Sequence, residues 1–123
     1  MTKFTSDSDE DMMYKEYTFT YIPVGYEINY YIHDDNWCYQ EFLSTDGYIQ
    51  IDQSKSSETS VQLDTENATY RIVRLKDIEL HHVIKHNTHS VLWKIEGTTF
   101  YLTCKDNLEW EEIEKIILGA ITY

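Results

Sequence analysis

The sequence predicts an α+β domain, with a mostly antiparallel, meandering sheet of six or seven strands and one long C-terminal helix packed on one face. Apolar residues alternate with period two over residues 90–95 and 100–104, on either side of Glu96 and Gly97, which is typical of a β-hairpin. After Asn107 the apolar spacing becomes helical. The other apolar runs are separated by short turns, which join antiparallel rather than parallel strands.

The chain opens with an acidic segment that precedes the folded domain. Residues 1–16 are rich in aspartate and serine and poor in apolar residues, so we expect them to be disordered. We expect residues 17–123 to form a single α+β domain, because a chain of this length buries one core. Its first ordered element is predicted over residues 17–26, where Pro23 and Gly25 require a turn.

Period-two alternation predicts the strands that follow. Residues 54–60 form a serine-rich stretch without periodicity, which predicts a loop, and residues 64–67 offer side-chain caps for a turn or a short helical segment. Ahead of the hairpin of residues 90–104, the predicted strands cover residues 27–32, 37–43, 48–53, 70–75 and 78–84.

The C-terminal helix is predicted from a single apolar stripe, which must be buried against the sheet to be stable. Glu109, Glu111 and Glu112 lie in or beside its first turn, where the helix dipole favours carboxylates. We therefore assign these three residues to the helix start rather than to acid–base chemistry. The apolar residues at helical spacing are Leu108, Ile113, Ile116, Ile117, Ala120 and Ile121.

The net charge of −12 limits the kinds of partner. Between Tyr17 and Tyr70, nine carboxylates face a single lysine, Lys55. The negative electrostatic potential of so many carboxylates repels phosphate groups. We therefore expect no binding to nucleic acid and no membrane contact by this segment itself. No apolar run approaches the roughly 20 residues that cross a bilayer. A membrane anchor outside the segment stays open, as does whether Met1 is the natural start.

The cysteines and histidines are the first candidates for chemistry. Cys38 and Cys104 form no zinc motif, and both lie on predicted strands, which favours buried free thiols. A disulfide between them stays open if the domain works outside the cell. The densest group of potential metal ligands is His81, His82, His86 and His89.

The spacing of these histidines argues against a ready-made metal site. Adjacent His81 and His82 point to opposite faces of a strand, although His82 and His89 could meet across a hairpin. We favour histidines at the surface or rim, with a metal site or a proton sensor as alternatives. The sequence contains no nucleophile motif and no zinc motif, and its four glycines are too scattered to form a phosphate-binding loop. We therefore predict no enzymatic activity and no catalytic, cofactor-binding or metal site.

Aromatic residues are the remaining candidates for binding. Packing in the core or on the sheet explains most of them. If several share the solvent face, they would form an aromatic patch with an acidic rim that suits a partner or ligand. The residues concerned are Tyr26, Tyr30, Tyr31, Trp37, Tyr39 and Tyr48.

Three motifs are notable for their order and spacing: Tyr21-x-Pro23-x-Gly25-Tyr26, then Leu63-Asp-Thr-Glu-Asn-Ala68, then Leu92-Trp93-x-x-x-Gly97 followed by Phe100-x-Leu102 and Asn107-Leu108. Together they resemble the DUF4367 family, which consists of small domains of unknown function found mostly in Firmicutes. The resemblance covers about residues 17–121.

The resemblance implies an extracytoplasmic domain, because the family often forms the outward-facing end of membrane-anchored proteins, some of them similar to anti-sigma factors. The sequence departs from the family pattern at Glu109, where a small hydroxyl cap is common, and at Cys104, where serine or glycine is usual. The family has no assigned activity, so no functional residue is carried over.

Charge, composition and resemblance together predict a non-enzymatic binding or sensing domain on the extracytoplasmic face of the bacterial cell envelope. We expect it to recognise a protein or small ligand through one sheet face or through the loop at residues 54–60. The alternative is a stand-alone acidic protein of the cytoplasm that binds a basic protein partner.

Overall fold

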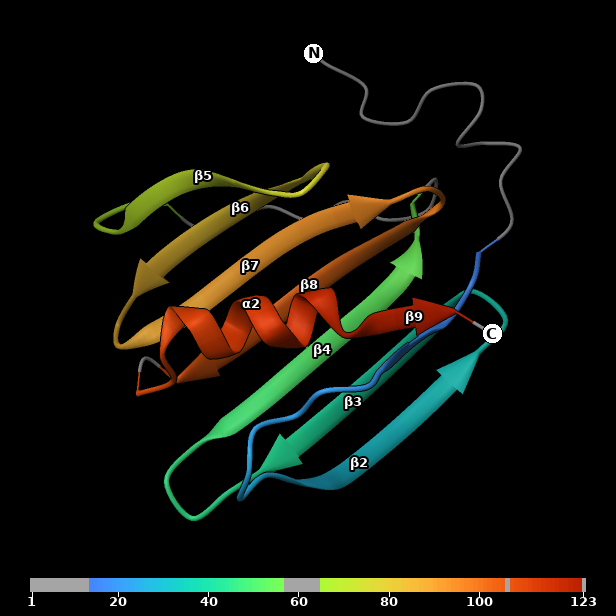
Figure 1. Ribbon diagram of the computed structural model, residues 1–123, viewed down its shortest axis with the longest axis horizontal. Coiled ribbons are helices and arrows are strands. Elements are labelled where there is room, and N and C mark those ends of the chain that lie inside the picture. The colour runs from blue at the N-terminus through green and yellow to red at the C-terminus, as the bar shows by residue number, and fades with distance from the viewer. Residues whose placement is uncertain (1–13, 57–64, 106, 123) are drawn as a thin grey trace.

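The computed structural model describes residues 14–56, 65–105 and 107–122, in which a seven-stranded antiparallel sheet carries one helix (Figure 1). This confirms the predicted fold class. The elements in chain order are β1 (Tyr17–Phe19), β2 (Glu27–Asp34), β3 (Trp37–Leu43), β4 (Tyr48–Lys55), β5 (Thr69–Leu75), β6 (Ile78–Lys85), β7 (Thr88–Ile95), β8 (Thr98–Lys105), α2 (Trp110–Leu118) and β9 (Ala120–Thr122).

The strand order of the large sheet is β2-β3-β4-β8-β7-β6-β5, and all neighbours are antiparallel. Two runs of hairpins therefore meet where β4 pairs with β8, so the predicted meander is interrupted at the centre of the sheet. β8 suits the centre because the side chains of Phe100, Leu102 and Cys104 are fully buried. β5 suits an edge because it carries Arg71 and Arg74 and is largely exposed.

Tight turns join the strands where the sequence predicts them. Lys76, His86, Asn87 and Glu96 have positive φ angles of 55°, 51°, 60° and 50°, respectively. Positive φ at the centre of a two-residue loop gives a turn whose twist matches the right-handed twist of the flanking strands. These turns hold β5, β6, β7 and β8 in consecutive hairpins.

The helix is shorter than the sequence predicts. It ends at Leu118, and Ala120 and Ile121 belong to β9, which pairs with β1 in a small second sheet. The backbone N–H and the hydroxyl of Thr20 both donate to the carbonyl of Gly119, at 2.9 and 2.7 Å, and so hold the chain beside β1 at this point. The prediction was wrong here because the spacing of two apolar residues fits a strand as well as a helix.

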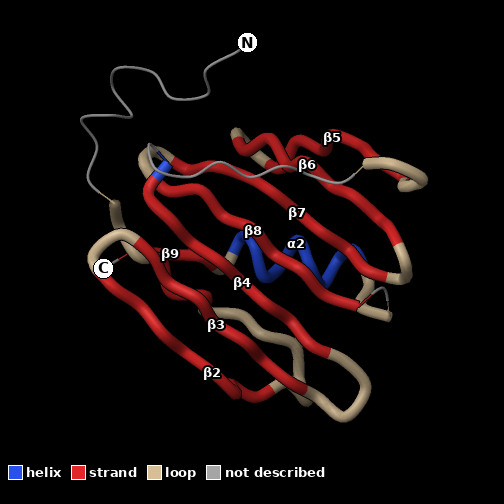
Figure 2. The backbone as a smooth tube through the Cα atoms, turned by 180° about the vertical axis from the view of Figure 1, so that it is seen from behind, coloured by secondary structure: helices blue, strands red, loops and turns tan. Residues whose placement is uncertain are grey.

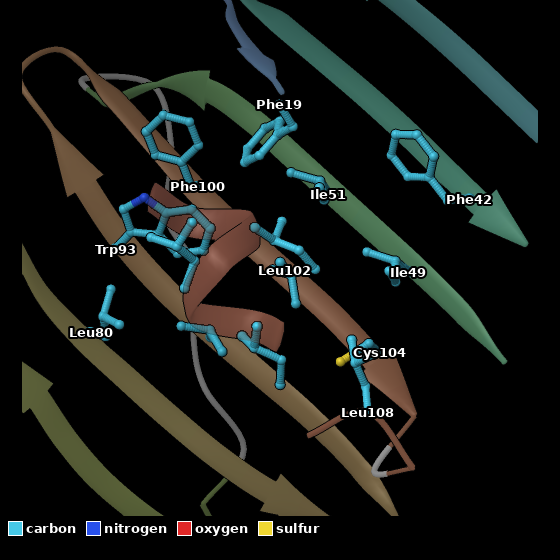
Figure 3. Close-up of a cluster of buried hydrophobic side chains, with 14 of the residues drawn as sticks. Phe19, Phe42, Ile49, Ile51, Leu80, Trp93, Phe100, Leu102, Cys104 and Leu108 are labelled. Carbon is cyan, nitrogen blue, oxygen red and sulfur yellow. The ribbon is translucent and has the colours of Figure 1, made fainter. Parts of the chain in front are cut away.

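The helix and the small sheet cover one face of the large sheet (Figures 1 and 2). The apolar side of α2 is formed by Ile113, Ile116 and Ile117, which are at most 1% exposed. They belong to the same buried cluster as Ile51 and Leu102 of the sheet (Figure 3). The predicted packing of the helix on one face of the sheet is therefore confirmed. Burial of each such side chain stabilises the fold by about 1.5–3 kcal/mol.

Three further predictions concern segments at the margins of the described residues. Strand β4 continues to Lys55, so the loop predicted from residue 54 begins later, and residues 57–60 lie outside the described part. The polar end of β4 is strand because it pairs with β8, Ser54 opposite Thr99. Residues 1–13 of the predicted disordered segment lie outside the described residues. Residue 64, the first of the predicted capping residues 64–67, also lies outside them. Residues 65–68 form a turn, with Ala68 donating to the carbonyl of Thr65.

Candidate functional site

Two of the four clustered histidines are buried and bonded to each other. His82 lies on β6 and His89 on β7, and their rings are stacked with His82 Nε2 2.8 Å from His89 Nδ1. Their exposed fractions are 1% and 7%, so the expectation of surface or rim histidines was wrong for this pair. His86 is exposed in its turn, as predicted. The pair is buried because it lies on the sheet face that the helix covers.

Arg71 and Trp110 complete this cluster. The guanidinium of Arg71 donates through Nε to His82 Nδ1 at 2.9 Å and also lies 4.7 Å from the centre of the Trp110 ring. Trp110 is the first residue of α2 and stacks on His82 at 4.4 Å. The cluster therefore joins edge strand β5, the two inner strands and the start of the helix. We call Arg71, His82, His89 and Trp110 the histidine cluster.

The histidine cluster suits a structural contact better than a metal site. The donor from Arg71 requires His82 Nδ1 to accept, and Nε2 faces His89, so both ring nitrogens of His82 are engaged. Burial, with further contributions from His89 and Arg71, lowers the pKa of His82 to about 4. Among the described residues, no group of three or more histidine, cysteine, aspartate or glutamate side chains could hold a metal ion.

His81 faces the opposite side of the sheet, as predicted. Its Nδ1 lies 2.6 Å from the hydroxyl of Tyr70, and its Nε2 lies 3.1 Å from a carboxylate oxygen of Glu79. These neighbours belong to β5 and β6, at one edge of the sheet. His81 therefore takes no part in the histidine cluster.

The two cysteines are completely buried and form no disulfide, as favoured from the sequence. Cys38 is paired in register with Gln53 and Cys104 with Ile49, so they lie two strands and four residues apart. This corresponds to roughly 16 Å, whereas a disulfide needs Cα atoms within about 7 Å. Burial raises the pKa of the Cys38 thiol to about 12, so it remains protonated and unreactive at neutral pH.

The face of the large sheet that lies away from the helix carries a continuous row of side chains across all seven strands. In register this row runs Ile32, Tyr39, Asp52, Tyr101, Leu92, His81 and Ile72. In the described part of the chain, no helix or strand packs over this face (Figure 2). We call it the open face.

Asp52 lies at the centre of the aromatic part of this row. Tyr39 of β3 and Tyr101 of β8 flank it on the two neighbouring strands, and the indole Nε1 of Trp37 donates to its Oδ1 at 3.3 Å. The carboxylate is half-buried, and this burial raises its pKa even though the indole bond opposes the shift. The site is thus a partly desolvated carboxylate with a tyrosine beside it on each neighbouring strand.

A second carboxylate, that of Glu41, lies in the next row. It accepts hydrogen bonds from Asn29 at 2.9 Å and Gln50 at 3.2 Å, and these bonds lower its pKa. The hydroxyl of Tyr39 also donates to it, at 3.3 Å. The ring of Tyr30 lies 6.1 Å from that of Tyr39. The open face therefore combines aromatic rings with two fixed carboxylates.

The structure brings together four of the aromatic residues considered in the sequence. Tyr30, Trp37, Tyr39 and Tyr48 share the open face, which meets the condition set for an aromatic patch. The side chain of Tyr31 points to the other face, where its hydroxyl donates to Glu16.

Of the other aromatic residues, Tyr26 packs against the core. Asp52 and Tyr101 were not singled out from the sequence. The predicted hairpin of residues 37–53 could have placed Asp52 beside Tyr39. Tyr101 becomes the second neighbour of Asp52 only through the β4–β8 pairing, which no local signal predicts.

Comparison with known proteins gives a family but no function. A family model described as "Domain of unknown function (DUF4367)" matches residues 16–119, which is most of the chain. No curated protein and no solved structure matches the chain. Among the described residues, the helix is too short and too polar to cross a membrane.

Proposed function

The chain belongs to the DUF4367 family, whose function is unknown, and we propose that it is a non-enzymatic binding domain that recognises a basic segment of a protein partner through the open face. Asp52 is the observation that carries this proposal, because a half-buried carboxylate between two tyrosines is suited to a lysine or arginine side chain. An ammonium or guanidinium group there would gain a charge-assisted hydrogen bond and cation–π contacts.

Charge supports the choice of a basic partner. The protein carries a net charge of −12, and Glu41 adds a second carboxylate one row from Asp52. Attraction over the whole surface accelerates encounter with a basic molecule, whereas close contacts on the open face provide selectivity. Cation–π contacts at partly exposed sites contribute about 0.5–1 kcal/mol each, so two tyrosines are a useful addition to the carboxylate.

We place this domain at the extracytoplasmic face of the bacterial cell envelope, an assignment that rests on the resemblance to the family. The second candidate is a stand-alone acidic protein of the cytoplasm with the same kind of basic partner. The two cysteines fit either location, because they are too far apart to form a disulfide even in an oxidising compartment.

A labelling experiment separates the two locations. Thr45 is exposed in the turn before β4, whereas both natural cysteines are fully buried. A Thr45→Cys variant in intact cells of the producing organism should react with a membrane-impermeant maleimide if the domain faces outward. Labelling only after lysis would place it in the cytoplasm, and the unsubstituted protein controls for reaction at the natural cysteines.

Nuclear magnetic resonance tests the binding site itself. The ¹⁵N-labelled domain is titrated with octalysine, with octaglutamate as the control peptide. We expect the lysine peptide to shift the indole N–H signal of Trp37, which is bonded to Asp52, and the backbone amides around Asp52 and Tyr101. Shifts confined to the helix side, or spread over every acidic segment, would refute recognition by the open face.

A further inference from the structure

Strand β2 forms one edge of the sheet and is exposed along its whole length. All eight of its residues are exposed, and the exposed fractions of its large side chains are 55% for Ile28, 50% for Tyr30, 45% for Tyr31 and 40% for Ile32. The strand pairs with β3 on one side only (Figure 1). Within residues 14–56, 65–105 and 107–122, no backbone hydrogen bond is made along its other side, so this side presents backbone N–H and C=O groups beside a run of apolar surface.

Natural edge strands usually carry features that prevent pairing with another chain, such as lysine, proline or a bulge. β2 contains no lysine, arginine or proline. An irregularity in register lies between Ile28 and Tyr30, near the start of the strand. From Tyr30 to Asp34 the pairing with β3 is regular, so this five-residue stretch is a straight template for a further strand.

Neighbouring contacts hold the side chains of this stretch in place on both faces. On the open face, the ring of Tyr30 lies 6.1 Å from that of Tyr39. On the other face, the ring of Tyr31 stacks on His33 at 5.1 Å, and His33 lies 3.5 Å from a carboxylate oxygen of Glu16. An incoming strand would therefore meet an ordered surface and lose little free energy in ordering it.

The charge of this edge selects the kind of strand that fits. The β2–β3 hairpin, residues 27–43, contains four carboxylates and neither lysine nor arginine. Antiparallel pairing of β2 with β2 of a second copy would put Glu27 opposite Asp34 at both ends, where like charges destabilise the pair. A segment that alternates lysine or arginine with apolar residues would instead complement both the charge and the exposed apolar side chains.

The opposite edge strand, β5, is the other candidate to pair with β2 of a second copy. It carries Arg71 and Arg74, but both are engaged within their own chain. Arg71 is bonded to His82, and Arg74 lies 3.8 Å from a carboxylate oxygen of Glu79. The cations of β5 thus already have partners within their own chain, which weakens their attraction to the acidic edge of another copy.

We propose that residues 30–34 of β2 accept an extended basic segment of the protein partner as an additional strand of the sheet. This rests on the proposed function, because it assumes a protein partner, and it adds the mode of binding. Backbone hydrogen bonds would supply affinity, and the charge and apolar pattern would supply selectivity. The edge adjoins the open face at Tyr30 and Ile32, so one partner can use both.

The probe is an acetylated and amidated heptapeptide of alternating lysine and valine. Two control peptides have the same sequence with every second backbone amide N-methylated, one at the odd-numbered residues and one at the even-numbered residues. Methylation removes backbone hydrogen-bond donors and keeps the charge. We expect the first peptide to shift the amide signals of β2 in the ¹⁵N-labelled domain. We expect at least one methylated peptide to bind about tenfold more weakly.

Two matched variants place the site on this edge. Ile32→Lys and Thr69→Lys add the same charge at exposed positions of opposite edge strands, and Thr69 lies outside the open face. Each variant is expected to fold, which circular dichroism checks. Only Ile32→Lys should weaken the unmethylated peptide, by about tenfold, because a lysine on β2 repels the basic strand.

Equal weakening by the two variants, equal binding of all peptides, or self-association of the domain in sedimentation would overturn the proposal. If octalysine shifts the signals around Asp52 but the heptapeptide leaves β2 unchanged, strand addition fails while binding by the open face stands. If neither peptide has a site-specific effect, both proposals fail.

Discussion

Acid should weaken the fold through His82, because this histidine is buried in its neutral form. The ordinary histidine pKa is 6.5 in the unfolded chain, and burial between His89, Arg71 and Trp110 lowers the pKa of His82 to about 4 in the folded protein. Between these values the unfolded chain binds more protons, so stability rises with pH. The contribution is complete above pH 6.5 and is lost as pH falls towards 4.

The size of this effect follows from the difference between the two pKa values. A difference of about 2.5 pH units corresponds to about 3 kcal/mol, since each unit is worth 1.36 kcal/mol. Such a loss is a large part of the 5–15 kcal/mol that stabilises a typical domain. We expect the free energy of unfolding to fall by about this amount between pH 7 and pH 4, in addition to any effect of the carboxylates.

Urea unfolding at a series of pH values measures this, with His82→Gln and His86→Asn as matched variants. His86 is exposed and has a φ of 51°, which asparagine tolerates. His82→Gln should be less stable at pH 7, because it removes the imidazole that accepts from Arg71 and stacks on Trp110. It should also lose the part of the slope between pH 4 and 6.5 that comes from His82. His86→Asn should keep it. A His82→Gln protein with the unchanged slope would refute the role assigned to the histidine cluster.

Three further substitutions test other parts of the structure. Gly119→Ala should lower the free energy of unfolding by about 1–3 kcal/mol, because a Cβ there would lie 3.0 Å from Thr20 Oγ1 and 3.1 Å from a backbone nitrogen; an unchanged thermal midpoint would argue against the tight contact between the helix end and the chain after β1. Gln53→Leu should cost about 1–3 kcal/mol for each of the two backbone groups of Tyr17 that the buried amide now bonds, at 2.7 and 2.8 Å, and urea unfolding that shows no loss would contradict this role. Asp52→Asn should stabilise the domain at neutral pH, because the raised pKa means that the ionised carboxylate opposes folding above pH 3.8, and destabilisation at pH 7 would contradict the assigned environment.

Local signals in the sequence were sufficient for most of the sheet. β3 has the bounds predicted for it, because turn residues flank it on both sides and its partner strands are its sequence neighbours. Tight turns likewise define the hairpins from β5 to β8. The alternation of His81 and His82 across a strand was also correctly predicted. The contact of His82 with His89 across the hairpin was recognised only as an alternative, and the burial of the pair was not predicted.

Long-range pairing accounts for what the sequence did not predict. The place of β8 beside β4 joins residues about fifty positions apart, and no local pattern encodes that choice. The same holds for β9, since Ala120 pairs with Phe19 from the opposite end of the domain. Asp52 acquires its second aromatic neighbour, Tyr101, only through the β4–β8 pairing, so the candidate site depends on the least predictable feature of the fold.

The affinity of the domain for octalysine in two matched variants tests the open face most directly. Asp52→Asn and Asp77→Asn remove the same charge, but Asp77 is exposed in the turn between β5 and β6, away from the aromatic row. Calorimetry should show about tenfold weaker binding for Asp52→Asn and little change for Asp77→Asn. Equal affinities of the two variants would mean that net charge alone attracts the peptide, and this result would contradict a site at Asp52.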